Sequence, residues 1–191
     1  EVLDATQIAA IAQAVSAGAI AIGVWVAYGQ LKATRQAVVK KRRAELAEEL
    51  MVVVGQVEDA FKNMRNPFDS IPQDRLGDKE FIYRKRYDRI MSTNDLFLRL
   101  REYQIRCEAV FPSEDLQPLV SKLFSARTDV AIAIEELISN EVRRSQGDIS
   151  DAREHRRVLY GTWTDRDEFG TEILETLSAI RKIAKQHASA N

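Results

Sequence analysis

The chain has few of the residues that interrupt helices or cross-link a fold. Only 8 of its 191 residues are glycine and 4 are proline, and Cys107 is the single cysteine. One cysteine excludes an internal disulfide, so nothing in the sequence points to an oxidising compartment. Scarce glycine and proline, together with abundant Ala, Leu, Glu and Arg, favour helix over sheet. No segment alternates apolar and polar residues with the period of two that is typical of strands.

The chain also lacks a substantial net charge. Its 28 basic and 29 acidic residues leave a formal net charge of -1. A domain that binds nucleic acid is usually basic, so we expect no nucleic-acid partner. The length suits one domain with a real core and is short for two.

Charged residues are absent from the range 5–31. A helix needs about 20 largely apolar residues to cross a bilayer core, so this run predicts a single transmembrane helix. Trp25 and Tyr28 lie toward its C-terminal end, where amphipathic rings favour the headgroup region. The alternative is a buried central helix of a soluble protein, because Gln13, Ser16 and several alanines make the run only moderately hydrophobic.

Small residues recur at every fourth position within this run. They form two series, the first Ala10, Ala14 and Gly18, the second Ala19, Gly23 and Ala27. Such spacing lets two helix backbones approach closely in lipid, where packing drives association. The pattern predicts docking on another membrane helix, from a different subunit or from a second copy, although helices rich in alanine also show it by chance.

A cluster of basic residues with no acid among them follows the run: Lys32, Arg35, Lys40, Lys41, Arg42 and Arg43. Positive residues beside a span stay on the cytoplasmic side, so we expect an inner-membrane protein with its N-terminus outside and its body in the cytoplasm. The same charges would attract anionic lipid headgroups. No aromatic residue is interleaved for base stacking, which argues against a nucleic-acid interface. The uncharged run followed by a basic helix resembles the start of many small bacterial membrane proteins, a resemblance that covers the anchor alone.

Beyond the basic cluster, a narrow apolar stripe continues the helical pattern. Its members are Leu46, Leu50, Val53, Val57, Phe61 and Met64. No proline or turn cluster separates this stripe from the uncharged run, so we predict one helix from about Thr6 to Arg65. Its juxtamembrane part, residues 32–65, is a basic stalk. Two prolines and several polar residues over 66–77 then predict a loop.

Residues 78–188 predict a soluble helical bundle, in which short connections favour antiparallel neighbours. Ser113 and Thr164 are placed as N-caps, the latter with Asp167 completing a capping box. The predicted fold class is therefore all-α, with an N-terminal transmembrane helix continuing into a stalk that is either a member of the bundle or an appendage. The helical segments of the bundle cover about 78–111, with a kink or break at 92–95, then 113–145, 150–160 and 164–188.

No motif in the chain carries recognisable chemistry, so we predict no enzyme, no metal site and no cofactor. Neither His155 nor His187 lies three residues after a glutamate, as a di-iron bundle requires, and we expect His187 to lie in a frayed tail. Cys107 lies on an apolar stripe, where a thiol is usually a core residue. The glycines are scattered singly, which excludes a phosphate-binding loop.

Two basic groups and one tryptophan are candidate interaction sites on the body. The groups are Arg84, Lys85, Arg86 and Arg89, and then Arg153, Arg156 and Arg157. Nearby acids favour ion-paired helix surfaces over a site for an acidic partner. Trp163 lies in a predicted turn, where it either closes the end of the bundle or anchors a partner.

These patterns favour three functions, in decreasing order. The first is a non-enzymatic, membrane-anchored accessory or scaffold subunit of a membrane protein complex. The second is a homo-oligomeric, membrane-tethered signalling or defence component, in which the stalk self-associates as a coiled coil. The third is an enzyme or ligand-binding bundle with a site between its helices.

Overall fold

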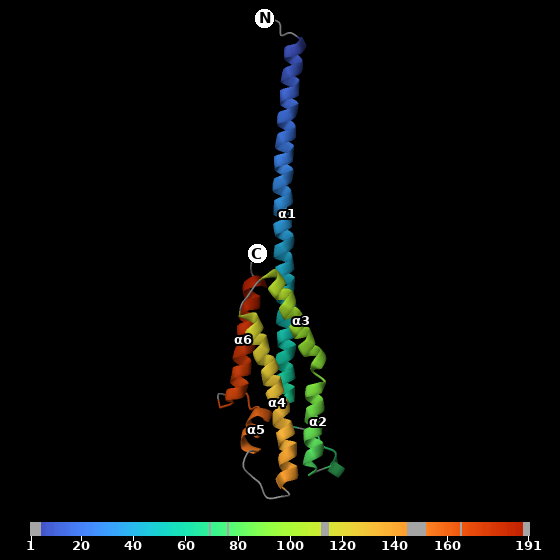
Figure 1. Ribbon diagram of the computed structural model, residues 1–191, viewed down its shortest axis with the longest axis vertical. Helices are drawn as coiled ribbons and strands as arrows, with labels where there is room; N and C mark the ends of the chain where they lie inside the picture. Colours follow the sequence, from blue (N-terminus) through green and yellow to red (C-terminus); the bar gives the residue numbers. More distant parts are fainter. Residues whose placement is uncertain are drawn as a thin grey trace. The chain divides into compact units, whose positions relative to one another are not determined.

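A computed structural model describes residues 5–68, 70–75, 77–111, 115–144, 152–164 and 166–188. All regular structure within these ranges is helical, which confirms the predicted all-α class (Figure 1). In chain order the elements are α1 (Ala5–Met64), the short 3-10 helix η1 (Gln73–Arg75), α2 (Lys79–Met91), α3 (Asn94–Val110), α4 (Leu116–Arg144), α5 (Ala152–Leu159) and α6 (Glu168–Ala188).

The chain divides into two compact units, residues 1–42 and residues 43–191. We call the first the N-terminal unit and the second the bundle. The bundle therefore begins inside the predicted stalk, well before residue 78, and it contains the C-terminal part of α1.

Among the helices that the structure describes, none is long and apolar enough to cross a membrane. The structure thus gives no support to the transmembrane helix predicted over 5–31. Within this range, the side chains of residues 5–12, 14, 15, 17 and 21 lie outside the described residues.

The apolar stripe of the predicted stalk lies in the core of the bundle. Its six residues, Leu46, Leu50, Val53, Val57, Phe61 and Met64, are each at most 1% exposed. Burial of one such side chain stabilises a fold by roughly 1.5–3 kcal/mol, so this helix face contributes strongly to folding. The part of the stalk from Arg43 onward is therefore a member of the bundle, and its stripe is already covered by the same chain.

Side chains from two neighbouring helices hold α1 in the bundle. Phe61 meets Phe97 of α3 edge to face, with ring centroids 5.8 Å apart. Arg181 of α6 forms an ion pair with Glu58 at 2.5 Å. On the other side of the core, α4 packs against α2, α3, α5 and α6 (Figure 1).

The chain breaks between α2 and α3, as the short polar residues at 92–95 predict. The hydroxyl of Thr93 donates to the carbonyl of Ile90 at 2.6 Å, which occupies a backbone acceptor at the end of α2. Arg127 of α4 then donates to the same carbonyl and to the Thr93 hydroxyl, each at 3.1 Å. These contacts fix the break against α4.

Candidate functional site

The most elaborate polar centre of the bundle is built around Arg65, the residue that follows α1. Its side chain is 0% exposed. The guanidinium donates to both carboxylate oxygens of Asp167, from Nη2 at 2.8 Å and from Nη1 at 3.0 Å. Two further hydrogen bonds run from Nε to the carbonyl of Val158 at 2.8 Å and from Nη2 to that of Arg157 at 3.2 Å. Such a two-pronged ion pair is strong and fixes the direction of both groups.

Aromatic rings and two glycines enclose this guanidinium. It lies 5.0 Å from the ring centroid of Trp163 and 4.9 Å from that of Phe169. A Cβ at Gly161 would lie 2.9 Å from its Nη1, and one at Gly170 only 2.7 Å, so both positions require glycine. Trp163 thus packs against this guanidinium, and its backbone φ of 53° is a left-handed conformation that residues other than glycine seldom adopt.

Asp167 also caps the N-terminus of α6. Its carboxylate accepts the backbone N–H of Gly170 at 2.9 Å, together with those of Thr162 and Trp163 at 3.1 Å. Burial opposes the charge, but the hydrogen bonds from Arg65, Gly170 and Trp163 outweigh it and lower the pKa of Asp167. The predicted cap at Thr164 is therefore wrong, because Asp167 supplies the acceptor and α6 starts at Glu168. The other predicted cap, Ser113, lies outside the described residues.

The contacts of this centre join the end of α1 to α5, to α6 and to the loop between them. The hydrogen bonds of both partners are directed at groups of the same chain, and aromatic rings cover the guanidinium. A hollow of about 480 Å³ opens beside it, lined by residues that include Glu154, Arg157, Arg166 and Glu168. The lining carries charges of both signs, and Arg157 faces Glu154 at 3.7 Å, so no ligand of one charge is favoured there.

The basic group on α2 has a structural role that the sequence did not reveal. Arg89 donates to the carbonyl of Asn63 at 2.9 Å, Arg86 to that of Pro67 at 3.0 Å, and Lys85 to that of Ser70 at 2.5 Å. These cations bind carbonyls at the C-terminal end of α1 and in the loop after it, where positive charge is favoured. Arg84 forms the expected helix-surface ion pair, with Glu80 at 2.6 Å.

Cys107 is buried in the core, and His187 contacts an aromatic ring. Burial, with Glu49 and Glu108 nearby, raises the pKa of the Cys107 thiol to about 12, so the nucleophilic thiolate is scarce at neutral pH. His187 lies in the last turn of α6 and stacks on Phe111, with centroids 4.1 Å apart, rather than in a frayed tail. Burial, followed by the charge of Arg43, lowers its pKa. The described part of the chain holds no group of three or more potential metal ligands.

The small-residue positions predicted for helix packing lie in the N-terminal unit. Gly18, Ala19, Gly23 and Ala27 are exposed, while the side chains of Ala10 and Ala14 lie outside the described residues. Large apolar side chains that are between 44% and 76% exposed surround them: Ile20, Ile22, Val24, Trp25, Val26, Tyr28 and Leu31.

These apolar side chains are distributed around α1 rather than along one side. At about 100° per residue they spread over roughly 240° of the helix circumference. The remaining sector contains Ala19, Gly23 and Ala27, and beyond them Gln30, whereas Gly18 lies within the apolar sector. Between residues 19 and 27 the N-terminal unit therefore has one face of small residues and a broad apolar face around the rest.

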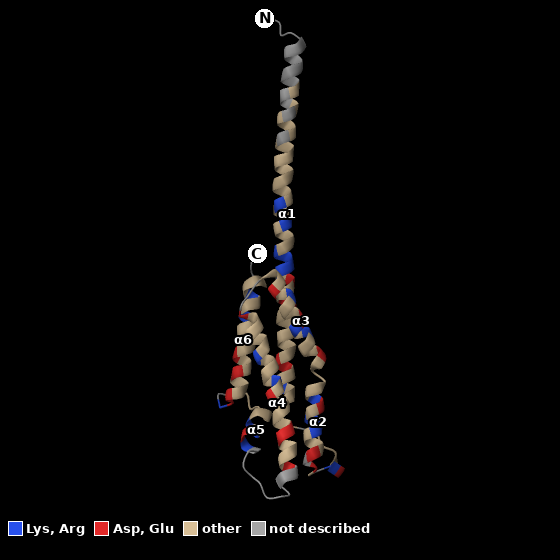
Figure 2. Ribbon diagram, in the orientation of Figure 1, with Lys and Arg blue, Asp and Glu red and all other residues tan. Residues whose placement is uncertain are grey.

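The predicted basic cluster divides between the two units. Lys32, Arg35, Lys40, Lys41 and Arg42 are exposed on the N-terminal unit, where Figure 2 shows α1 changing from uncharged to basic. Arg43 belongs to the bundle, and its Nε donates to the carbonyl of Val110 at the end of α3, at 3.1 Å. Arg43 thus supplies a hydrogen-bond donor to a carbonyl at the C-terminal end of α3, in addition to its charge.

No protein family, curated protein or solved structure matches this chain. The functional proposal therefore depends on the chemistry and geometry of its own residues.

We expect Arg65→Ala to destabilise the bundle by about 3–5 kcal/mol, because it leaves the Asp167 carboxylate buried without its counter-charge. Thermal unfolding of the full chain in mild detergent, followed by circular dichroism, measures the loss. Arg181→Ala is the matched control: it removes a partly exposed ion pair with Glu58 and should cost about 1 kcal/mol or less. Equal losses in the two variants would contradict a special role for Arg65.

The lowered pKa of Asp167 makes its contribution to stability depend on pH. The ionised carboxylate stabilises the fold above its ordinary pKa of 3.8, and this stabilisation is lost as the pH falls through the lower pKa of the folded state. Asp167→Asn should therefore be less stable than the wild type near neutral pH, with the difference shrinking on acidification below about pH 4. Denaturant midpoints over a pH series test this. A difference that stays constant into the acid range would show that the ionised form is not what stabilises the fold.

Proposed function

We propose that the protein is a non-enzymatic, membrane-anchored accessory or scaffold subunit of a membrane protein complex. Its N-terminal unit docks on a neighbouring membrane helix, and its bundle lies at the cytoplasmic surface with the N-terminus on the opposite side. The observation that carries the proposal is the division of the N-terminal unit into a small-residue face and a broad, exposed apolar face.

The two faces suit two different neighbours. A helix with apolar side chains over most of its circumference is stable only where it is surrounded by apolar material, in a protein core or in lipid. The sector with Ala19, Gly23 and Ala27 is shaped for close approach of another helix backbone, which is how helices associate in lipid. Both requirements are met when a partner helix lies against the small-residue face and lipid surrounds the apolar face.

The basic residues after this segment support the orientation. Lys32, Arg35 and Lys40 follow the apolar segment, while Glu1 and Asp4 are the charged residues among the four that come before it in the given sequence. Positive charge is retained on the cytoplasmic side of a span, which places the bundle there.

The polar centres of the bundle support a scaffold role rather than an enzymatic one. Arg65 and Asp167 are engaged with one another, Arg86 and Arg89 bind backbone carbonyls, and the Cys107 thiol stays protonated. These five side chains therefore have structural uses.

A second candidate, a homo-oligomeric signalling or defence component, uses the same small-residue face. A second copy of this chain fits that face as well as a different subunit does. The coiled coil predicted through the Leu46–Met64 stripe is not available for it, because that stripe lies in the core of the bundle.

Substitution of Gly23 tests the docking face. Gly23→Leu places a bulky side chain on the small-residue face, where it should block a partner helix. Gly29→Leu is the matched control, because Gly29 lies on the apolar face and a Cβ at either glycine meets nothing within 4 Å in this chain. Both variants should therefore fold alike.

The measurement is the mass of the complex extracted from native membranes in mild detergent. We expect the wild type and Gly29→Leu to form a complex heavier than one chain, and Gly23→Leu to be monomeric. A second polypeptide in the complex supports the accessory-subunit proposal, whereas copies of this chain alone support the homo-oligomer. A monomeric wild type contradicts both.

A further inference from the structure

We infer that Lys32, Arg35, Lys40, Lys41 and Arg42 form a collar around α1 that binds the anionic phospholipid headgroups of the cytoplasmic membrane surface. The inference rests on the proposed membrane anchoring and adds the lipid class that the anchor selects. Arg43 is not part of the collar, because it belongs to the bundle and binds the carbonyl of Val110.

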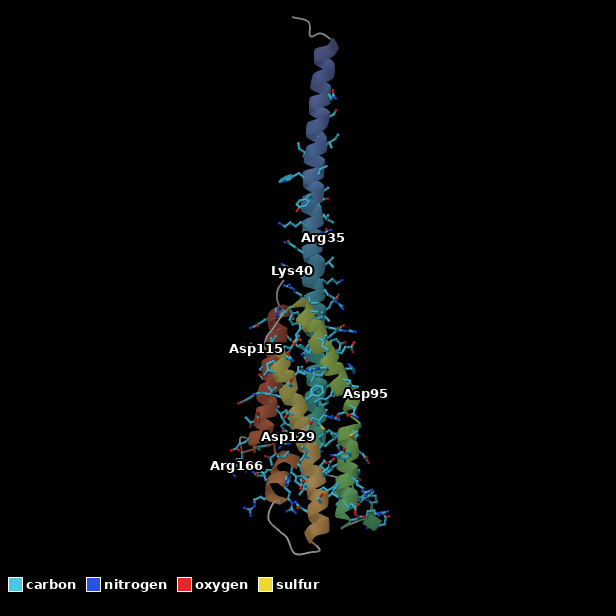
Figure 3. The ribbon with its side chains drawn as sticks, in the orientation of Figure 1. Arg35, Lys40, Asp95, Asp115, Asp129 and Arg166 are labelled. Carbon is cyan, nitrogen blue, oxygen red and sulfur yellow. The ribbon has the colours of Figure 1, made fainter. Side chains whose placement is uncertain are left out.

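The five basic residues point in all directions from the helix. At about 100° per residue, no sector wider than roughly 100° of the circumference lacks one of them. All five residues are exposed, and Figure 3 labels Arg35 and Lys40 on α1. A ring of this kind meets a surface that surrounds the helix, whereas a stripe would meet a partner on one side.

The distribution also decides how the helix meets the membrane. A helix that lies flat on a membrane has one apolar face and one basic face along the same length. Here the apolar residues from Ile20 to Leu31 and the basic residues from Lys32 to Arg42 follow one another along the axis, and each set spreads around it. This order suits a helix that passes through the headgroup layer.

The spacing along the axis fits the thickness of that layer. Trp25 and Tyr28, both strongly exposed, precede Lys32 by roughly 10 Å and 6 Å at 1.5 Å per residue. Their rings favour the headgroup boundary. Lys32 and Arg35 then lie at the headgroups, and Arg42 lies about 15 Å beyond Lys32, within two screening lengths of the surface at physiological salt.

The charge around the collar is uniformly positive. No acidic residue occurs between Asp4 and Glu45, so Lys32, Arg35 and Lys40 have no carboxylate within one helical turn in the sequence. Phospholipid is favoured over nucleic acid as the anion, because no aromatic residue lies between Lys32 and Arg42 for base stacking.

The test compares two variants of the full chain that each lose three positive charges. The collar variant is Lys32→Gln, Arg35→Gln and Lys40→Gln. The matched control is Arg99→Gln, Lys122→Gln and Arg153→Gln, which removes three exposed charges from the bundle. Each protein is reconstituted into nanodiscs of neutral phosphatidylcholine with a minor fraction of phosphatidylglycerol, then released into mild detergent, and the lipid that stays bound is measured by native mass spectrometry.

We expect the wild type and the control to retain phosphatidylglycerol well above its bulk fraction. Each base near the surface contributes about 1 kcal/mol to the attraction of anionic lipid, a factor of about five. Since the collar variant lacks three bases, its enrichment should fall by at least the factor of about five that one base contributes. Added salt should reduce the enrichment of the wild type. The collar proposal is overturned if the collar variant is as enriched as the wild type, or if the control loses as much enrichment as the collar variant. Either result leaves the membrane anchoring standing. Failure of the wild type to enter nanodiscs of neutral lipid overturns the membrane anchoring on which it rests.

Discussion

The bundle depends on the buried guanidinium of Arg65. A buried charge destabilises a protein unless a counter-charge and a full set of hydrogen bonds accompany it. The surrounding structure meets this requirement with the Asp167 carboxylate, the carbonyls of Arg157 and Val158, and two aromatic rings. The same centre includes the cap that Asp167 provides for α6, the glycines that approach the guanidinium, and the left-handed backbone of Trp163.

The same helix, α1, has two different environments along its length. From Leu46 onward one stripe is buried and the opposite side is polar, the pattern of a helix on the surface of a soluble core. Between Ile20 and Leu31 large apolar side chains are exposed over most of the circumference. The bundle supplies the cover for the first part, and we propose lipid and a partner helix as the cover for the second.

Local patterns were sufficient to predict the helices. Apolar spacings of three and four predict the elements of the bundle, and the polar residues at 92–95 predict the break that separates α2 from α3. These signals are local because a helix closes its hydrogen bonds within four residues. The role of the stalk stripe was open, since the spacing shows that a face is buried but not what buries it.

Contacts between distant segments were not predictable in this way. Arg65 and Asp167 are 102 residues apart, and nothing in either local sequence identifies the partner. Arg86 was assigned to a basic surface but is buried, because the carbonyl it binds and the Tyr160 ring that it covers are contributed by other segments. Thr164 has the spacing of an N-cap, but Asp167 caps α6 instead. Asp167 is held at that position by its ion pair with Arg65.

The most direct test of the account is the accessibility of single cysteines along α1 in open membrane sheets, probed with a maleimide that does not enter lipid. Cys107 is buried with a raised pKa, so the native thiol contributes little background. Ile22 and Val26 lie on one side of the helix and Val24 lies on the opposite side. Cysteines at all three positions should stay unlabelled, while one at Gln36 should react. Labelling of all three at the rate of Gln36 would contradict the claim that this segment is enclosed by apolar surroundings.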